Sequence, residues 1–331
     1  MNLRPPGLAV LFAFGLATAS IAQAPHMSGG SVLIFPHFDS RPASATVISV
    51  TNTSTDRSRC ANGFRRGDVR IHYIYYGQSP GRACREFDRI ESLTPGDTLT
   101  VLANEHNLEG EMGFLTVAAT DPVTGDLIQF DELIGDAYVA NASLDIMWSY
   151  VPYPFRGLGI GSGDVDGCGR VVIGSGGTLC FDGIDYDAFP GALYVSSFFE
   201  ERAGVFENRL SLMSTSGQDY INEVSFLFYN NEEDVFSRTF KFVCHTSVPL
   251  SEISGVARNL NGDPTEFLVE TGWASIEGRR VLSLSGNPVS LPKDDIPALL
   301  GVFVQIVRSD FTAGHALHVD YDTTILTQLP N

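Results

Sequence analysis

The feature that most constrains the fold of this chain is a partial internal repeat. Elements between residues 32 and 139 recur in the same order between residues 193 and 305. Their spacing drifts while their order is kept, which is typical of a duplicated module whose loops have changed length. Two unrelated strand-rich stretches can also agree in part, so duplication is a hypothesis at this level. The matched pairs are Phe38/Phe199 (161 apart), Ser49/Ser211 (162), Val69/Val224 (155), Phe87/Phe240 (153), Phe114/Phe267 (153) and Gly135/Gly301 (166).

The hydrophobic pattern is that of half-buried strands. Ile71, Tyr73 and Tyr75 share one face of a predicted strand, and Arg70 and His72 share the other. Val224, Phe226 and Phe228 repeat this pattern in the second half. Residues 299–307 are apolar on both faces for most of their length, which predicts a central strand covered on both sides. Turn signals such as those at residues 94–97 and 261–264 recur at short intervals.

We therefore predict an all-β protein with two tandem, duplicated, antiparallel β-sandwich domains of Ig-like or jelly-roll-like type. Roughly eight strands in each half suit domains of ordinary size. The expected organisation is a signal peptide at 1–22, a first sandwich at 28–156, a Gly/Asp-rich linker or hairpin at 157–190 and a second sandwich at 191–331.

The N-terminus has the layout of a secretory signal peptide. Arg4 precedes an apolar stretch from about Leu8 to Ala19, and small residues follow. The stretch is shorter than the roughly 20 apolar residues that span a bilayer. Cleavage before Gln23 is favoured over cleavage before Pro25, because proline after the scissile bond fits a peptidase cleft poorly. We expect an exported protein that is periplasmic, on the cell surface or extracellular.

The charge of the chain limits its partners. With 21 basic and 39 acidic residues the formal net charge is −18, which argues against nucleic acid, since phosphates demand a basic face. An acidic surface keeps a secreted protein soluble. No later segment is apolar enough to be a membrane span, so we expect partners among envelope or extracellular proteins or glycans.

Five cysteines are compatible with an oxidising compartment. Cys168 and Cys180 flank a strand and a Gly-rich reversal, which predicts a disulfide across a hairpin. Cys60 and Cys84 form a second candidate pair, although they bracket a strand and their pairing requires the preceding loop to fold back. Cys244 alternates with phenylalanines and is predicted to be a buried thiol.

Several segments of the first half carry a resemblance; they are Val-Leu-Ile-Phe-Pro at 32–36, Val-Ile-Ser-Val-Thr-Asn-Thr at 47–53, Val-Arg-Ile at 69–71, Arg-Glu-Phe-Asp at 85–88 and Leu-Thr-Pro-Gly-Asp at 93–97. On these segments the chain resembles an uncharacterised family of bacterial exported β-rich proteins, which open on a Val-Leu-x-Phe-Pro strand. The similarity covers about 70 residues and departs after Pro36, where members usually have two tyrosines. It implies secretion and β structure, with no assigned activity.

The densest group of oxygen ligands is Asp164 and Asp166, with Asp182, Asp185 and Asp187 further on. Calcium binds six to eight oxygens, and Asp-x-Asp-Gly begins many such loops. The EF-hand pattern fails here, because its third ligand and its final Glu are missing. A solvated acidic loop is the first interpretation, and calcium is the alternative. No other cofactor is predicted.

No catalytic, cofactor-binding or metal residue is predicted. The chain has no His-Glu-x-x-His, paired Cys-x-x-Cys or Gly-x-Ser-x-Gly motif. His315 and His318 are expected on opposite faces of one strand, and Cys244 and His245 face apart for the same reason. Four aromatics cluster at the end of the first half, and burial between the halves is favoured over a sugar platform; they are Trp148, Tyr150, Tyr153 and Phe155.

These features together predict a non-enzymatic surface, matrix or envelope protein that binds, if at all, through its end loops. A carbohydrate- or calcium-binding adhesion module is the alternative. A hydrolase on a β scaffold is the second alternative, and it requires two carboxylates that converge in a cleft.

Overall fold

The computed structural model describes residues 29–79, 82–107, 110–159, 168, 171–173, 178–202, 205–258, 260, 270–289, 296–307, 311–325 and 327–330. The predicted signal peptide, Asp164 and Asp166 lie outside the described residues. Helices are short, four residues each: α1 (Ala103–His106), α2 (Leu250–Ile253) and the 3₁₀ helix η2 (Gly255–Arg258). None of the helices in the described ranges is long and apolar enough to cross a membrane.

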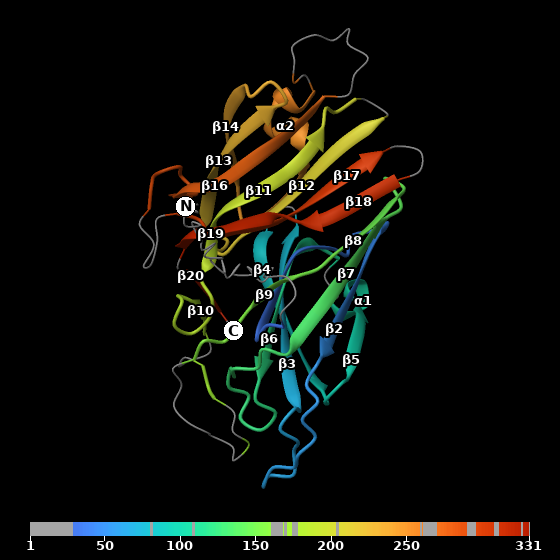
Figure 1. Ribbon diagram of the computed structural model, residues 1–331, viewed down its shortest axis with the longest axis vertical. Helices are drawn as coiled ribbons and strands as arrows, with labels where there is room; N and C mark the ends of the chain where they lie inside the picture. The colour runs from blue at the N-terminus through green and yellow to red at the C-terminus, as the bar shows by residue number, and fades with distance from the viewer. Residues whose placement is uncertain are drawn as a thin grey trace, which may run out of the picture.

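The first half of the molecule, blue to green in Figure 1, contains two antiparallel sheets. One sheet has the strand order β4-β3-β6-β1-β9, and the other has the order β5-β2-β7-β8. The strands are β1 (Val32–Asp39), β2 (Ser44–Asn52), β3 (Val69–Ser79), β4 (Arg82–Leu93), β5 (Thr98–Leu102), β6 (Met112–Thr120), β7 (Leu133–Asn141), β8 (Ile146–Tyr150) and β9 (Tyr153–Phe155).

The second half, yellow to red in Figure 1, also contains a five-stranded and a four-stranded antiparallel sheet. Their orders are β14-β13-β16-β11-β19 and β15-β12-β17-β18, and β10 pairs with β20 in a small separate sheet. The strands are β10 (Thr178–Phe181), β11 (Phe189–Phe199), β12 (Phe206–Ser214), β13 (Tyr220–Asn230), β14 (Val235–Phe242), β15 (His245–Pro249), β16 (Thr271–Ser283), β17 (Leu299–Val307), β18 (Phe311–Ala316), β19 (His318–Ile325) and β20 (Thr327–Pro330). The predicted all-β class is therefore confirmed, with four large antiparallel sheets.

The two halves share one strand order. Adding ten to each strand number of the first-half sheets gives the second-half sheets. The halves also share a local irregularity, because β1 shifts register after Phe35 and β11 shifts register after Val195. Gly113 and Gly272 stand opposite these β-bulges. A Cβ at either glycine would meet a backbone carbonyl oxygen of the neighbouring strand, at 1.9 Å and 2.5 Å respectively, so both sites require the close approach that glycine permits.

The predicted strand patterns agree with the observed burial. Residues 71, 73 and 75 lie in one hydrophobic cluster, and residues 224, 226 and 228 lie in another. β17 is covered on both sides as predicted: Leu299 and Phe303 join the second-half core, whereas Val302 and Val304 join the cluster of the first half. β1 is buried along its whole length.

A third hydrophobic cluster joins the halves. It takes Ile34, Tyr76 and Phe114 from one face of the first five-stranded sheet, and Met213 and Leu300 from the second half. The hydroxyl of Tyr153 in β9 donates hydrogen bonds to the carbonyls of Gly301 and Leu317, at 2.8 and 3.0 Å. The halves therefore contact each other through buried apolar surface and direct hydrogen bonds.

Both predicted disulfides are wrong. The structure pairs Cys60 with Cys168 and Cys84 with Cys244, at Cα separations of 5.2 and 5.5 Å, and Cys180 keeps its thiol. Cys180 does not pair with Cys168 because its strand, β10, is paired to β20. Cys84 reaches Cys244 because the start of β4 lies against the chain that precedes β15. The second disulfide thus links the two halves covalently.

Candidate functional site

The candidate site is a cavity of about 70 Å³ between the two halves. Small-molecule sites usually measure about 300–1,000 Å³, so this cavity has room for a few waters or one small ion and is too small for a sugar ring. It is lined by His37, Asp39, Arg41, Val139, Asn141, Leu144, Ile146, Trp148, Arg209, Ser211, Ser247 and Val304.

The β-bulge near the end of β1 places His37 at this cavity. Pro36 and His37 lie within the register shift of the β1–β6 ladder, and Pro36 has no N–H for the ladder. The backbone of His37 is held by Tyr150 instead. Its N–H donates to the Tyr150 hydroxyl at 3.2 Å, and that hydroxyl donates back to the His37 carbonyl. The His37 side chain is buried.

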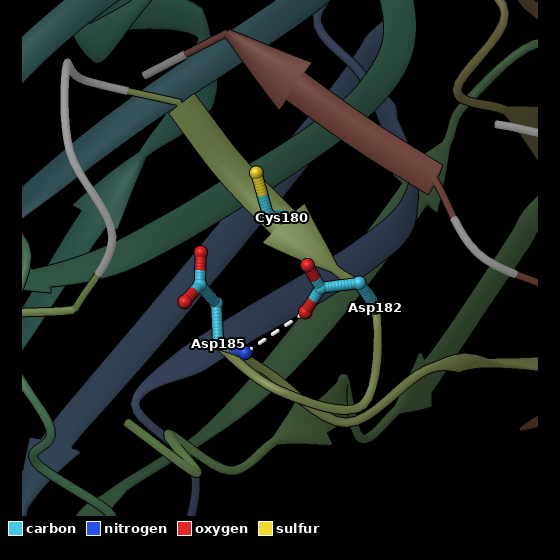
Figure 2. A group of neighbouring side chains, drawn as sticks. All are labelled: Cys180, Asp182 and Asp185. Atoms are coloured by element: carbon cyan, nitrogen blue, oxygen red, sulfur yellow. Dashed lines mark hydrogen bonds between the residues drawn. The ribbon is translucent and has the colours of Figure 1, made fainter. Parts of the chain in front are cut away.

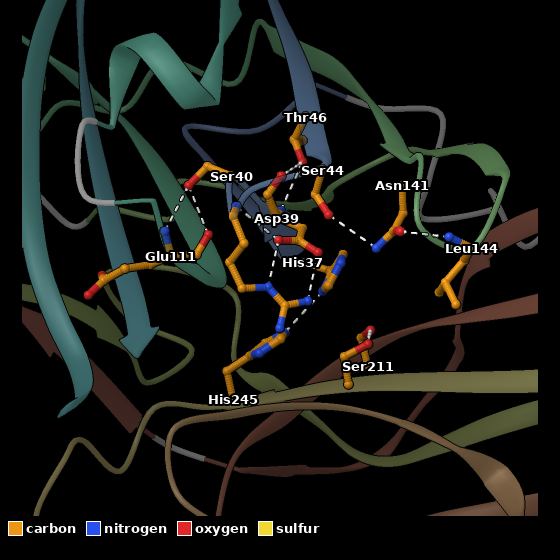
Figure 3. Close-up of polar contacts among 12 residues, drawn as sticks. His37, Asp39, Ser40, Ser44, Thr46, Glu111, Asn141, Leu144, Ser211 and His245 are labelled. Atoms are coloured by element: carbon orange, nitrogen blue, oxygen red, sulfur yellow. Dashed lines mark hydrogen bonds and ion pairs between the residues drawn. The ribbon is translucent and has the colours of Figure 1, made fainter. Parts of the chain in front are cut away.

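His37 meets a second buried histidine across the boundary between the halves (Figure 3). His37 Nδ1 lies 3.3 Å from Nε2 of His245, the first residue of β15. Their rings stack with centroids 5.3 Å apart, and the His37 ring also stacks on Trp148 at 5.6 Å. A hydrogen bond between two imidazoles requires one nitrogen to donate and the other to accept, so at least one of the two rings must be neutral.

Burial keeps both histidines neutral. It lowers the pKa of His37 to about 4, an effect opposed by Asp39 and reinforced by Arg41 and Arg209. Burial also lowers the pKa of His245, and a charge on His37 would lower it further. Nδ1 of His245 is buried without a hydrogen-bond partner, which adds a desolvation cost at this point of the interface.

Asp39 is committed to an ion pair with Arg41. The guanidinium donates to both carboxylate oxygens, at 2.9 and 2.8 Å. Burial acts to raise the pKa of Asp39, but Arg41 outweighs it and holds that pKa below its usual range. The hydroxyl of Ser211 donates to that of Ser247 at 2.9 Å. The polar groups around the cavity therefore bind one another, which is an arrangement that stabilises an interface.

A second cluster follows β10, where Cys180, Asp182 and Asp185 bring their ligand atoms within 4.8 Å of one another (Figure 2). One oxygen of Asp182 already accepts the N–H groups of Ile184 and Asp185, at 3.0 and 2.8 Å. A soft thiolate is a poor ligand for calcium, which binds oxygens.

Of the residues considered for the calcium alternative, Asp182 and Asp185 lie close together, and Asp187 forms an ion pair. Asp187 binds Arg156 through both carboxylate oxygens, at 3.0 Å each. The donors near Asp182 include a sulfur atom and do not fit calcium.

The aromatic cluster at the end of the first half is buried. Trp148 is 7% exposed and stacks on Tyr150 as well as on His37. Tyr153 and Phe155 lie in the cluster that joins the halves. This placement agrees with the interface interpretation, and it leaves these rings no open face on which a sugar could stack.

One prediction about histidine neighbours is wrong, and one contact between histidines was not predicted. His315 and His318 lie in different strands, β18 and β19, with ring centroids 6.4 Å apart. They do not share a strand because the chain crosses between two sheets at Leu317. Sequence reasoning also missed the contact of His37 with His245. The two residues are 208 positions apart and belong to no common motif, so only the packing of the halves reveals them.

No protein-family model and no curated protein matches this sequence. One solved structure, titled "Cryo-EM Atomic Structure of Broad Bean Stain Virus (BBSV)", aligns with 93% of this chain and 97% of its own. The sequence identity is 10% and the TM-score is 0.20, a similarity too low to carry an argument about fold or function.

Proposed function

We propose that this chain is an exported, non-enzymatic surface, matrix or envelope protein built from two duplicated β-sandwiches. The observation that carries the proposal is the shared strand order of the two halves, with its constant offset of ten. The equivalent bulges, each opposite a glycine, support a common origin of the halves. The signal-like N-terminus and the resemblance to exported β-rich proteins support export.

The ladders also explain the drifting spacing of the repeat. Ser49/Ser211 and Gly135/Gly301 occupy equivalent ladder positions. For three other matches the ladders indicate different equivalent residues: Phe38 corresponds to Phe198, Ile71 to Val224, and Phe87 to Phe236. Phe267 lies outside the described residues. The shifts of two and four residues at Val224 and Phe236 keep every side chain on its face of the sheet, so sequence comparison alone can match the right strands in the wrong register. The one-residue shift at Phe38 instead selects Phe199, which lies on the opposite face from the buried Phe198.

A structural role is supported by the way the halves are joined. The Cys84–Cys244 disulfide, the shared hydrophobic cluster and the two hydrogen bonds from Tyr153 hold them together. Domains that move relative to each other to close on a ligand usually share a small, polar interface. Here the boundary contains a shared apolar cluster and a disulfide, which suits a rigid component of a surface or matrix.

The contacts at the cavity support a non-enzymatic protein. The Asp39 carboxylate is neutralised by Arg41, and the two neutral imidazoles face each other in a buried position. General acid–base catalysis needs a group that reaches a substrate proton, whereas a cavity of about 70 Å³ admits no glycan or peptide.

Two experiments test this function. Fractionation of producing cells, with N-terminal sequencing, should find the protein outside the cytoplasm and beginning at Gln23; full-length protein retained in the cytoplasm would refute export. Purified protein should not turn over glycan, peptide or ester libraries. Turnover that a single point substitution abolishes would refute the non-enzymatic assignment.

A further inference from the structure

The five-stranded sheet of the second half has an outer face that is exposed, although the equivalent face of the first half is buried in the interface between the halves. In the first half, Tyr76 stacks on Phe114 across β3 and β6, with centroids 4.6 Å apart. This pair is 4% and 1% exposed, because it belongs to the cluster that residues of the second half complete. Cys244 and Val243, which lie between β14 and β15, belong to that covering layer.

The equivalent pair in the second half is Tyr229 and Trp273. The two residues face each other across β13 and β16, at the ladder position that Tyr76 and Phe114 hold across β3 and β6. Their rings stack with centroids 3.9 Å apart and an interplanar angle of 1°. Trp273 nevertheless is 39% exposed. Its ring therefore stands on an outer sheet face that the described part of the chain leaves open.

The surface that covers the first five-stranded sheet also has an equivalent in the other half. The second four-stranded sheet packs on the first half through Met213, Leu300, Val302 and Val304. The ladders equate these four residues with Thr51, Ile134, Asp136 and Tyr138 of the first four-stranded sheet. Ile134 and Tyr138 are 44% and 49% exposed. The second half contacts the first half through this surface of its four-stranded sheet. The equivalent surface of the first half is exposed to solvent.

We propose that copies of this chain join head to tail through these two faces. The first four-stranded sheet and the β4–β5 turn of one copy cover the Tyr229–Trp273 face of the next, as the second half covers the first half within one chain. The inference rests on the duplication in the proposed function and adds a partner, a second copy of the chain. Such an interface joins two different surfaces, so it generates rings or filaments.

Continuity with the interface inside the chain singles out this partner. Terminal units of repeat proteins usually present a polar outer face that ends the stack, whereas both faces here keep large apolar side chains. Thr51 and Asp136 make the free surface more polar than its counterpart at Met213 and Val302. The contact between copies is therefore weaker than the contact within the chain, and it is reversible.

The disulfide between the halves provides a test of this geometry. Counting two residues back from the equivalent residues Glu86 and Val235 of the ladders places Cys84 at the position of Glu233, and both residues have a positive φ, 52° and 68°. Cys244 directly precedes β15, as Asp97 directly precedes β5, and the two strands occupy the same ladder position. If copies repeat the internal interface, Glu233 of one copy lies beside Asp97 of the next.

The experiment is cysteine cross-linking of the full chain in a Cys180→Ser background. The Asp97→Cys/Glu233→Cys variant should form a ladder of disulfide-linked multimers that reductant collapses, with a yield that rises with protein concentration. The control is Asp126→Cys/Glu233→Cys, because Asp126 is also an exposed aspartate in a turn of the first half. We expect at least tenfold less multimer from this control. Equal yields from the two variants would overturn the proposal.

Sedimentation of the protein without added cysteines provides a second readout. The sedimentation coefficient should rise with concentration, and Trp273→Glu should abolish the rise. Ile90→Glu should not, because Ile90 is an exposed apolar residue of the first five-stranded sheet, which supplies neither of the two proposed sheet faces. Identical behaviour of the two variants would overturn the proposal and leave the face to a different partner. The duplication is tested separately, because an experimental structure can show equivalent halves whether or not copies associate.

Discussion

Mild acid should destabilise this protein through the histidine pair between its halves. His37 has a pKa of about 4 in the folded protein, lowered chiefly by burial, against about 6.5 in an unfolded chain. The unfolded state therefore binds more protons between these two values. The corresponding stability is fully present above pH 6.5 and is lost as the pH falls through the window from 6.5 to 4.

The size of the effect follows from the shift. One pKa unit corresponds to about 1.4 kcal/mol, so His37 alone contributes about 3 kcal/mol, of which about 2 kcal/mol is lost between pH 7.5 and pH 5. The pKa of His245 is lowered as well, so its loss adds to that of His37. Protonating His37 also places a cation near Arg41 and Arg209, with Asp39 as the opposing charge.

Urea unfolding at pH 7.5 and pH 5 measures this loss. Trp148 is a suitable fluorescence probe, because its ring stacks on His37. Carboxylates contribute to the pH dependence too, so the informative quantity is the difference between wild type and His37→Gln. The variant should lose about 2 kcal/mol less than wild type over this range. His318→Gln, which changes an exposed histidine, should behave as wild type does. Equal pH dependence of wild type and His37→Gln would refute the argument.

Three further predictions concern the disulfide, the side-chain packing and the close backbone contacts that hold the fold together. Replacing both Cys84 and Cys244 with serine opens a covalent loop of 160 residues and should lower the unfolding free energy by up to about 5 kcal/mol; chemical denaturation measures this, and an unchanged midpoint would contradict it. Gly314→Ala should loosen the joint between the halves and shift the Trp148 emission, because a Cβ there would meet the Trp148 ring at 2.4 Å; an unshifted spectrum would contradict it. Gly113→Ala and Gly272→Ala should each lower the melting temperature, because each added methyl group costs about 1–3 kcal/mol of folding stability. A lower melting temperature in only one of the two variants would contradict the equivalence of these glycines.

The sequence could predict the elements of the fold because they depend on local patterns. Alternation at residues 71–75 and 224–228 indicated strands with one buried face, and the structure buries those faces. The apolar run of β17 indicated a strand covered on both sides, which Val302 and Phe303 confirm by joining different clusters. In each case the information lies within about ten residues.

The register and the joints could not be predicted because they depend on how distant strands pack. Phe87 was matched with Phe240, four residues beyond its ladder equivalent Phe236, since both lie on the same face of β14. The cysteine pairs were chosen among neighbours in sequence, whereas the structure joins residues 108 and 160 positions apart. The contact of His37 with His245 could not be predicted for the same reason, because it too joins residues that are far apart in the sequence.

Burial differs between the ladder positions that the two halves share. Ala118 is buried beneath the second half, and its equivalent, Glu277, is exposed. This is the change expected where a face meets water, because a charged side chain costs nothing there and an apolar one gains nothing. Trp273 departs from this trend. It holds the ladder position of the buried Phe114 and is a large aromatic on an exposed face, in contact with the rings of Tyr229 and Tyr194. Exposed aromatic rings on a sheet face are the pattern expected of a contact site, and they place the apolar centre of the proposed assembly interface at Trp273.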